Sequence, residues 1–297
     1  MDEITSFATI LEKVRTHEKK TVVVADAAEP DVIAATFQAH EEKLANIIYV
    51  GDAERIRQLA DEAAANISEI DIIDEKDSWD AAKRALELVK NNEKAVLMKG
   101  KIGTSSLLGL LLKDSELKQR KPNPFVSHVA VFEWENRLKL FSDAGLNIAP
   151  DVPQKKRITL NAINVARKMG MYKPRVAFLS AVEKVSSKMV SSIEAAELAK
   201  MDWEDAIVGG PLAFDGAMFE KAYRIKGVPS PIEGKADILI CPNIETGNTL
   251  YKTLAWMLRP DMAGIITGAA IPCILTSRAD SARVKFLSIA TTLYLAA

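Results

Sequence analysis

The segment LTSRADS, residues 275–281, combines hydroxyl groups with a guanidinium between an apolar strand and the last helix. The guanidinium of Arg278 is a planar fork of N–H donors that suits phosphate, and Ser277 beside it offers a hydroxyl. Together with the N–H groups that open a helix, these side chains predict a site for a phosphate or a developing oxyanion. The competing interpretation is that Ser277 or Asp280 caps the helix and that Arg278 is a solvated charge.

A second strand-to-helix turn, PNIETGNTLYK, is rich in polar side chains, and its candidate ligands are Asn243, Glu245, Asn248 and Lys252. Gly247 permits a close approach of backbone. Asn248 and Lys252 are four residues apart, which places them on one face of a helix. An ordinary capped helix start explains the same pattern, and it is favoured when this turn is considered by itself.

Two further polar segments follow strands. KGKIGTSSLL contains Lys101 and Thr104 just before a helix and has the composition of a phosphate-binding loop, but it lacks the GxxxxGK[ST] spacing of a P-loop. We therefore expect no P-loop nucleotidase. SDAGLNIAPD contains Asp143, Asn147 and Asp151, which are candidates for lining a cleft between domains, and loop capping and turn formation explain them as well.

These segments belong to a chain in which strands and helices alternate. Short apolar runs are each followed by residues whose apolar positions recur at helical spacing. Such strands, separated by amphipathic helices, predict a parallel sheet covered on both faces, with ligands beyond the carboxyl ends of the strands. In the first part of the chain the predicted strands are 21–27, 47–51, 67–73 and 94–100, and the predicted helices are 31–45, 52–64, 78–89 and 104–112.

The middle of the chain interrupts this alternation. FVSHVAVFEW (125–134) and RLKLFSDAGLN (137–147) are strand-like runs separated only by Glu135 and Asn136. A parallel crossover needs roughly a dozen residues or more, so these runs predict an antiparallel hairpin, and we place a domain boundary near it. Alternation then resumes, with predicted helices at 155–170, 187–201, 214–225, 247–258 and 279–296 and predicted strands at 175–181, 205–210, 236–243, 263–268 and 273–277.

Composition and charge disfavour several classes of function. The 297 residues are 48% hydrophobic and 27% charged, which is typical of a globular protein. The 39 Lys and Arg residues balance 40 Asp and Glu residues. A net charge of -1 provides no overall positive potential that would attract nucleic acid. The N-terminus lacks the pattern of a signal peptide, and no apolar run approaches the roughly 20 residues that span a bilayer. We expect a cytoplasmic protein with neither nucleic-acid nor membrane partners.

Several familiar motifs are also missing from the sequence. No GxGxxG follows a strand and no GxSxG elbow is present, which argues against an ordinary NAD-binding domain and an α/β-hydrolase. The three histidines are scattered, and no Cys or His pair has zinc-ligand spacing, so we expect no metal site. Cys241 and Cys273 lie in apolar runs, as buried thiols of a reducing compartment do.

Taken in order along the chain, six segments resemble the phosphate acetyltransferase and phosphate butyryltransferase family, most closely its butyryl or branched-chain branch. The resemblance runs from about residue 94 to the C-terminus. It is carried by FVSHVAVFE, FSDAGLNIAPD, SAVEKV, GGPLAFDGA, GKADILICPNIETGNTLYKTL and ILTSRADSARVKFLSIA.

This resemblance implies a reaction in short-chain fatty acid metabolism in which acyl-CoA and inorganic phosphate give acyl phosphate and CoA, reversibly. CoA is then a substrate, no cofactor is permanently bound, and a homodimer or higher homo-oligomer is expected. The implied fold has two α/β domains, each a mostly parallel sheet with helices on both faces, around an active-site cleft. The expected domains are residues 1–130 completed by 275–297, and residues 131–274.

The resemblance also implies roles for individual residues. Ser277 and Arg278 match the family's Ser-Arg pair, with Arg278 neutralising the phosphate and the oxyanion and Ser277 donating a hydrogen bond to the carbonyl oxygen. The thiol of CoA attacks the acyl phosphate directly, without a covalent acyl-enzyme. The expected substrate-binding residues are Lys101, Thr104, Asp143, Asn147, Asn243, Glu245, Asn248 and Lys252.

Two positions depart from the acetyltransferase pattern. Val284 stands where a carboxylate of the final helix is proposed to assist thiol deprotonation, and Asp280, one helical turn earlier, is the expected substitute. Gly109 stands where acetyltransferases carry an arginine associated with CoA, and Lys113 or Lys101 is expected to compensate. These departures leave open a non-catalytic protein that binds acyl-CoA or acyl phosphate. A β-decarboxylating dehydrogenase is a third interpretation, which the missing metal-binding aspartate cluster disfavours.

Overall fold

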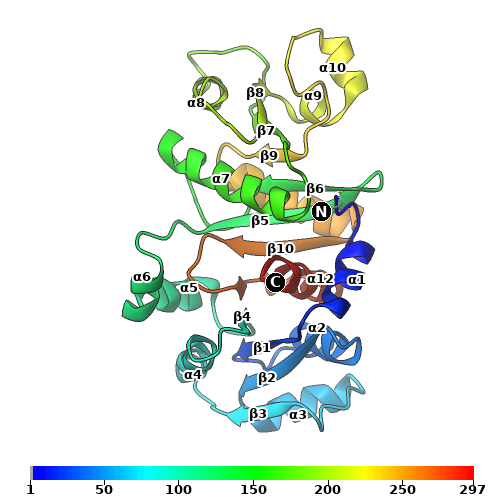
Figure 1. Ribbon diagram of the computed structural model, residues 1–297, viewed down its shortest axis with the longest axis vertical. Coiled ribbons are helices and arrows are strands. Elements are labelled where there is room, and N and C mark those ends of the chain that lie inside the picture. The colour runs from blue at the N-terminus through cyan, green and yellow to red at the C-terminus, as the bar shows by residue number, and fades with distance from the viewer. Residues whose placement is uncertain (1–2) are drawn as a thin grey trace. The chain divides into compact units, whose positions relative to one another are not determined.

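The computed structural model describes residues 3–297 and divides into two compact units (Figure 1). One unit contains Phe7–Pro124 and Asp261–Ala297, and we call it the split unit. The other contains Phe125–Pro260 together with residues 3–6, and we call it the middle unit. None of the described helices is long and apolar enough to cross a membrane.

The split unit is built around a parallel sheet with strand order β11-β4-β1-β2-β3. The β-branched run of β1, residues 22–24, is buried, as the sequence predicts, whereas β3 at the edge of the sheet is partly exposed. The elements are α1 (Phe7–Thr16), β1 (Lys20–Ala25), α2 (Pro30–Glu41), β2 (Ala45–Gly51), α3 (Ala53–Glu62), β3 (Asp71–Asp74), α4 (Ser78–Lys90), β4 (Ala95–Lys99), α5 (Thr104–Lys113), α6 (Ser115–Arg120), β10 (Met262–Thr267), β11 (Cys273–Ile274) and α12 (Ala282–Leu295).

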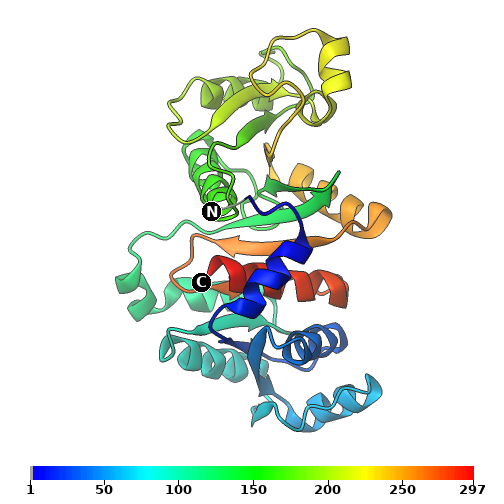
Figure 2. The same ribbon diagram turned by 45° about the vertical axis from the view of Figure 1, so that its right-hand side comes forward.

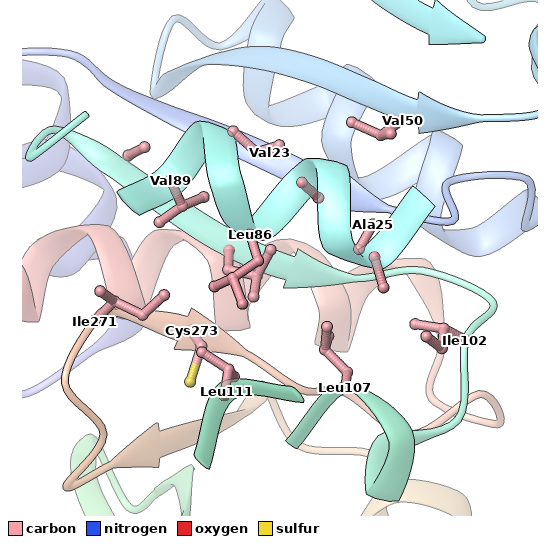
Figure 3. Packing of buried hydrophobic residues seen from close by; sticks show 14 of the residues in the cluster. Val23, Ala25, Val50, Leu86, Val89, Ile102, Leu107, Leu111, Ile271 and Cys273 are labelled. Carbon is pink, nitrogen blue, oxygen red and sulfur yellow. The ribbon is translucent and has the colours of Figure 1, made fainter. Parts of the chain in front are cut away.

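Helices cover both faces of this sheet. Figures 1 and 2 show α4 and α5 on one side and α2 and α12 on the other. In the core under α4, Leu86 packs with Leu107 and Leu111 of α5 and with the buried thiol of Cys273 (Figure 3). The last helix, α12, contacts α1 and α2, so both ends of the chain's sequence contribute to one core.

The middle unit contains a mixed sheet, in which the strands follow the order β5-β6-β9-β7-β8. β5 and β6 form the antiparallel hairpin that the sequence predicts, and the other neighbours are parallel. The elements are β5 (Ser127–Trp134), β6 (Arg137–Ser142), α7 (Val152–Lys168), β7 (Arg175–Leu179), α8 (Val190–Ala199), β8 (Ile207–Leu212), α9 (Phe214–Met218), α10 (Glu220–Lys226), β9 (Ile238–Ile240), α11 (Ile244–Thr253) and the π-helical turn η1 (Leu254–Leu258).

The hairpin turn shows why the two runs pair. Glu135 and Asn136 both have positive φ, 49° and 59°, which is the backbone of a two-residue turn between antiparallel strands. Trp134 therefore lies opposite Arg137, and the ladder continues to Val129 opposite Ser142. The α/β class with two mostly parallel sheets is confirmed.

Some predicted elements differ from the structure. The predicted helix 214–225 is two short helices, because Phe219 is extended (φ -126°, ψ 117°) and its ring lies 6.2 Å from those of Trp134 and Phe214. The last strand ends at Ile274 instead of residue 277, which leaves Ser277 in a turn. Helices α1 and α6 were not predicted from the sequence.

The units also divide the chain differently from the expected domains. Residues 261–274 belong to the split unit, because β11 pairs with β4 and β10 contacts α12. At the other end, Ile4 is fully buried and its N–H donates to the carbonyl oxygen of Met169 at 2.8 Å, which holds the chain start in the middle unit.

Candidate active site

The turn that carries Ser277 and Arg278 lies at the carboxyl edge of the split unit's sheet. β11 pairs in parallel with β4, so the segments that follow these two strands leave the same edge of the sheet. Nη2 of Arg278 donates a hydrogen bond to the carbonyl oxygen of Lys101 at 3.2 Å. Arg278 and Lys101 are exposed, and Thr104 follows as the first residue of α5. The structure thus brings Ser277, Arg278 and Asp280 together in one turn and joins this turn to the backbone of Lys101, whereas it shows Thr104 only as the start of the helix that follows.

Asp280 is folded back onto this turn. Its side chain is buried, with 2% exposure of the residue, and Oδ2 accepts a hydrogen bond from the N–H of Ser277 at 2.9 Å. The N–H of Asp280 donates in return to the carbonyl oxygen of Ser277 at 3.1 Å. The interpretation of Ser277 or Asp280 as the helix cap is wrong, because Ser281 is the N-cap of α12 and accepts from the N–H of Val284.

Charged residues beneath this turn were missed by the sequence analysis. Lys285 is 1% exposed, and its ammonium hydrogen-bonds to backbone of the turn and lies 3.2 Å from Oε1 of Glu29. Lys99, at the end of β4, is also buried and donates to the carbonyl oxygen of Gly100 at 2.8 Å. Burial lowers the pKa of Lys99, and the nearby Glu29 carboxylate opposes that shift. A lysine within the apolar helix ARVKFLSIATTLYL was the available signal, since buried lysines are almost always paired.

In the middle unit, Asp143 organises the segment after β6. Its residue exposure is 2%, and Oδ1 accepts from the N–H groups of Gly145 at 2.7 Å and Leu146 at 2.9 Å. Oδ2 accepts from the N–H of His128 at 3.1 Å and from the amide of Asn147 at 2.6 Å. The Asn147 amide also donates to a backbone carbonyl oxygen at 3.0 Å. These contacts make Asp143 and Asn147 the groups that shape the segment, and their role as substrate ligands stays a prediction.

The start of α11 packs tightly on this segment. Asn243 caps the helix by accepting from the N–H and the hydroxyl of Thr246, at 3.0 and 2.7 Å. The amide of Asn248 donates to the carbonyl oxygen of Ala144 at 3.3 Å. A Cβ on Gly247 would lie 2.0 Å from the carbonyl oxygen of Asp143, so the predicted close backbone approach at Gly247 is confirmed.

The remaining predicted residues of α11 are at its surface and along its last turn. Glu245 is exposed in the first turn of the helix. The ammonium of Lys252 lies over the ring of Tyr251, 5.0 Å from its centre. The structure therefore gathers a second group of predicted residues in the middle unit: Asp143, Asn147, Asn243, Glu245, Asn248 and Lys252.

A cavity of about 690 Å³ opens beside the start of α11, within the middle unit. Glu245 is the only charged residue among the described residues that line it. The rest of the lining is apolar or carries hydroxyl and amide groups: Leu179, Ser180, Ala181, Ser191, Phe214, Pro242, Asn243, Thr246, Thr249, Leu250 and Thr253. This volume lies within the roughly 300–1,000 Å³ of small-molecule sites.

No group of three or more His, Cys, Asp or Glu side chains that could hold a metal ion occurs within residues 3–297. The two cysteines are free and buried, and burial raises the pKa of each thiol, Cys241 and Cys273, to about 12. Neither thiol is therefore ionised at neutral pH, so neither is suited to be a nucleophile.

An α/β fold with a Ser-Arg turn at a sheet edge is the architecture that the motif resemblance implies. A family model described as "Phosphate acetyl/butaryl transferase" matches this chain in two segments, residues 6–92 and 75–293. The chain belongs to this family, and the resemblance stated from its motifs is confirmed.

Individual relatives extend the match over nearly the whole chain. The chain is 39% identical to "Phosphate butyryltransferase" of Clostridium acetobutylicum, with 97% of each chain covered. It is 37% identical to "Phosphate acetyltransferase" of Rhizobium meliloti, over 95% of this chain and 91% of the relative. The structure is similar to that of a branched-chain phosphotransacylase from Enterococcus faecalis, with a TM-score of 0.81 and 33% identity over 93% of this chain and 99% of that one.

The close contact at Gly247 gives a testable prediction. Gly247→Ala should lower the free energy of unfolding by about 1–3 kcal/mol, because the new Cβ forces α11 away from the carbonyl of Asp143. Urea unfolding followed by circular dichroism measures this change.

Gly109→Ala is the matched control within α5. A Cβ there meets no heavy atom of the described chain within 4 Å, and alanine is favoured over glycine in a helix by about 0.5–1 kcal/mol. This variant should be at least as stable as the wild type. Equal stability of the Gly247→Ala protein and the wild type would contradict the tight packing of α11 against the carbonyl of Asp143.

Proposed function

We propose that this chain transfers a short acyl group, butyryl or branched-chain, reversibly between coenzyme A and inorganic phosphate. The observation that carries the proposal is the exposed Arg278 guanidinium, held beside Ser277 at the carboxyl edge of a parallel sheet in a chain of this family. A guanidinium offers the planar donor fork that phosphate oxygens accept best.

The proposed chemistry needs no covalent enzyme intermediate. In one direction, a phosphate oxygen forms a bond to the thioester carbonyl carbon, and the carbonyl oxygen takes the electron pair. The carbon–sulfur bond then breaks, and CoA leaves as a thiolate that takes up a proton. Arg278 would offset the charge of phosphate and oxyanion, while the Ser277 hydroxyl would donate to the carbonyl oxygen. Holding the two substrates together supplies much of the acceleration.

We assign the proton transfer at the CoA sulfur to Asp280. Val284, one turn further along α12, is buried and has no group that can accept a proton. The carboxylate of Asp280 accepts a hydrogen bond from the backbone N–H of Ser277. This contact supports a position of the carboxylate beside the reacting atoms. In the direction that forms acyl-CoA, this carboxylate would take the thiol proton, and in the reverse direction it would return it.

We assign the pantetheine arm of CoA to the cavity beside α11. Its wall offers hydroxyl and amide groups between apolar side chains, which suits an uncharged chain that carries amides. The carboxylate of Glu245 would repel the nucleotide phosphates, which we therefore place outside the cavity. The other middle-unit residues, Asn243 and Asn248 among them, would position α11 at this wall.

The setting in which the enzyme works is also part of the proposal. Two buried reduced thiols, Cys241 and Cys273, support a reducing compartment, the cytoplasm. Trp256, Met257 and Leu258 of η1 are exposed apolar side chains, which support a homodimer or higher homo-oligomer.

The reaction itself is tested by thiol release. Acetyl-, butyryl- and isobutyryl-CoA are incubated with the protein and a thiol-reactive dye, with and without phosphate. Release should require phosphate, should be fastest with butyryl- or isobutyryl-CoA, and should fall by at least about 10²-fold in Arg278→Ala because the oxyanion donor is lost. Folded protein that binds CoA but releases no thiol from any of the three would replace this proposal with the binding-protein interpretation.

The place of the pantetheine arm is tested by filling the cavity. Thr249→Trp should raise KM for butyryl-CoA by at least about tenfold, since an indole would occupy the space of the arm, and should leave KM for phosphate unchanged. Thr249→Ser is the control and should retain both constants. An unchanged KM for butyryl-CoA in Thr249→Trp would remove CoA from this cavity.

The role of Asp280 is tested by Asp280→Asn. The amide oxygen can still accept from the N–H of Ser277, but an amide cannot take the thiol proton. We expect kcat to fall by about 10²–10⁴-fold in the acyl-CoA-forming direction. Asp77→Asn, at the exposed N-cap of α4, is the control and should retain activity because Asn also caps helices. Normal turnover by Asp280→Asn would eliminate Asp280 as the base.

A further inference from the structure

Lys285 is a charged residue that the proposed chemistry does not use. It lies in the second turn of α12, among side chains that are apolar or small, and its residue exposure is 1%. Its ammonium donates to three carbonyl oxygens of the turn before the helix. The distances are 3.2 Å to Ser277, 3.3 Å to Arg278 and 2.5 Å to Asp280.

The charge of this ammonium is compensated by Glu29, at the N-cap position of α2. Nζ of Lys285 lies 3.2 Å from Oε1 of Glu29, which is itself 7% exposed. Neither carboxylate oxygen of Glu29 has a hydrogen-bond partner among the described residues. The negative charge of Glu29 is therefore compensated by the charges of the nearby lysines. A buried ion pair adds little net stability compared with apolar side chains of the same volume. The pair therefore needs another explanation than stability.

The three carbonyl contacts supply that explanation. β11 is only two residues long, so the sheet ladder ends before Ser277. Beyond this ladder, the path of the turn depends on polar contacts. The Lys285 ammonium binds the carbonyl oxygens of three of the four residues from Ser277 to Asp280. The same turn presents the Ser277 hydroxyl and the Arg278 guanidinium.

We propose that Lys285, with Glu29 as its counter-charge, is a positioning residue that holds the Ser277–Arg278 turn in the shape that receives phosphate. This inference rests on the proposed acyl transfer to phosphate. Lys285 touches the backbone of the turn and acts on the reaction through Ser277 and Arg278.

The test substitutes Lys285 by methionine, which keeps the length of the chain and removes the ammonium. Phosphate-dependent thiol release from butyryl-CoA should show a higher KM for phosphate and a lower kcat. Their ratio should fall by about 10²-fold, because a small displacement of the turn misplaces both reacting partners. The Kd of CoA, measured separately, should change by less than about twofold.

A matched control removes another buried lysine that has similar contacts. Lys139 of β6 is 8% exposed, donates to the carbonyl oxygen of Ala236 at 2.7 Å and pairs with Asp237 at 3.2 Å. Lys139→Met should lower Tm, as Lys285→Met does, but should keep KM for phosphate. Equal losses of phosphate use in both variants would reduce the role of Lys285 to general stability and overturn the inference.

Two conservative variants keep the test decisive if Lys285→Met does not fold. Lys285→Arg retains charge and donors and should recover at least about tenfold of the activity that methionine loses. Glu29→Gln removes the counter-charge with little change of shape and should raise KM for phosphate by several-fold. Wild-type kinetics in Lys285→Met, or in Glu29→Gln with Lys285→Met unfolded, would overturn the inference. A wild-type protein without phosphate-dependent release would instead overturn the proposed function.

Discussion

The parallel pairing of β4 with β11 is the constraint on which the candidate site of the split unit depends. It consists of only two residue pairs, Leu97 with Cys273 and Met98 with Ile274. Because parallel strands point the same way, the segments that follow them leave one edge of the sheet together. The contact between Arg278 and the carbonyl of Lys101 follows from that arrangement, although the two residues are far apart in sequence.

Because β11 is so short, the turn that follows it lies beyond the backbone hydrogen bonds that pair β11 with β4. Polar side-chain contacts hold the turn instead. The carboxylate of Asp280 closes the turn onto the N–H of Ser277, and the ammonium of Lys285 collects its carbonyls. In the middle unit, Asp143 does the same for the segment after β6, where a buried carboxylate accepts four N–H bonds. In both units a buried charge fixes irregular backbone beside a sheet edge, where apolar packing alone specifies no unique path.

The sequence predicted what depends on local pattern. Alternating apolar runs gave the parallel strands, and two polar residues between strand-like runs gave the hairpin. The sequence did not predict features that depend on contacts between distant residues. The ring of Phe219 packs between two other aromatic residues and interrupts a predicted helix. The long-range pairing of β11 shifts the boundary between the units. In the site, polar residues after strands located the turns. Spacing in the sequence does not show that the Asp143 carboxylate binds backbone N–H groups, or that Lys285 lies beneath the turn. Both depend on tertiary contacts.

The anion binding that we propose at this turn would depend on a local charge excess, since the whole chain has a net charge of -1. Three cations at the turn and beneath it, Lys99, Arg278 and Lys285, outnumber the two carboxylates that act on Lys99, those of Glu29 and Asp280. Coulomb interactions between partly buried groups are screened less than in water, so this excess is strong at the turn itself, whereas salt in the solvent screens it at larger distances. The positive neighbours of Lys99 also help burial to lower its pKa. A phosphate bound at Arg278 would oppose that effect, so phosphate binding and protonation of Lys99 would favour each other.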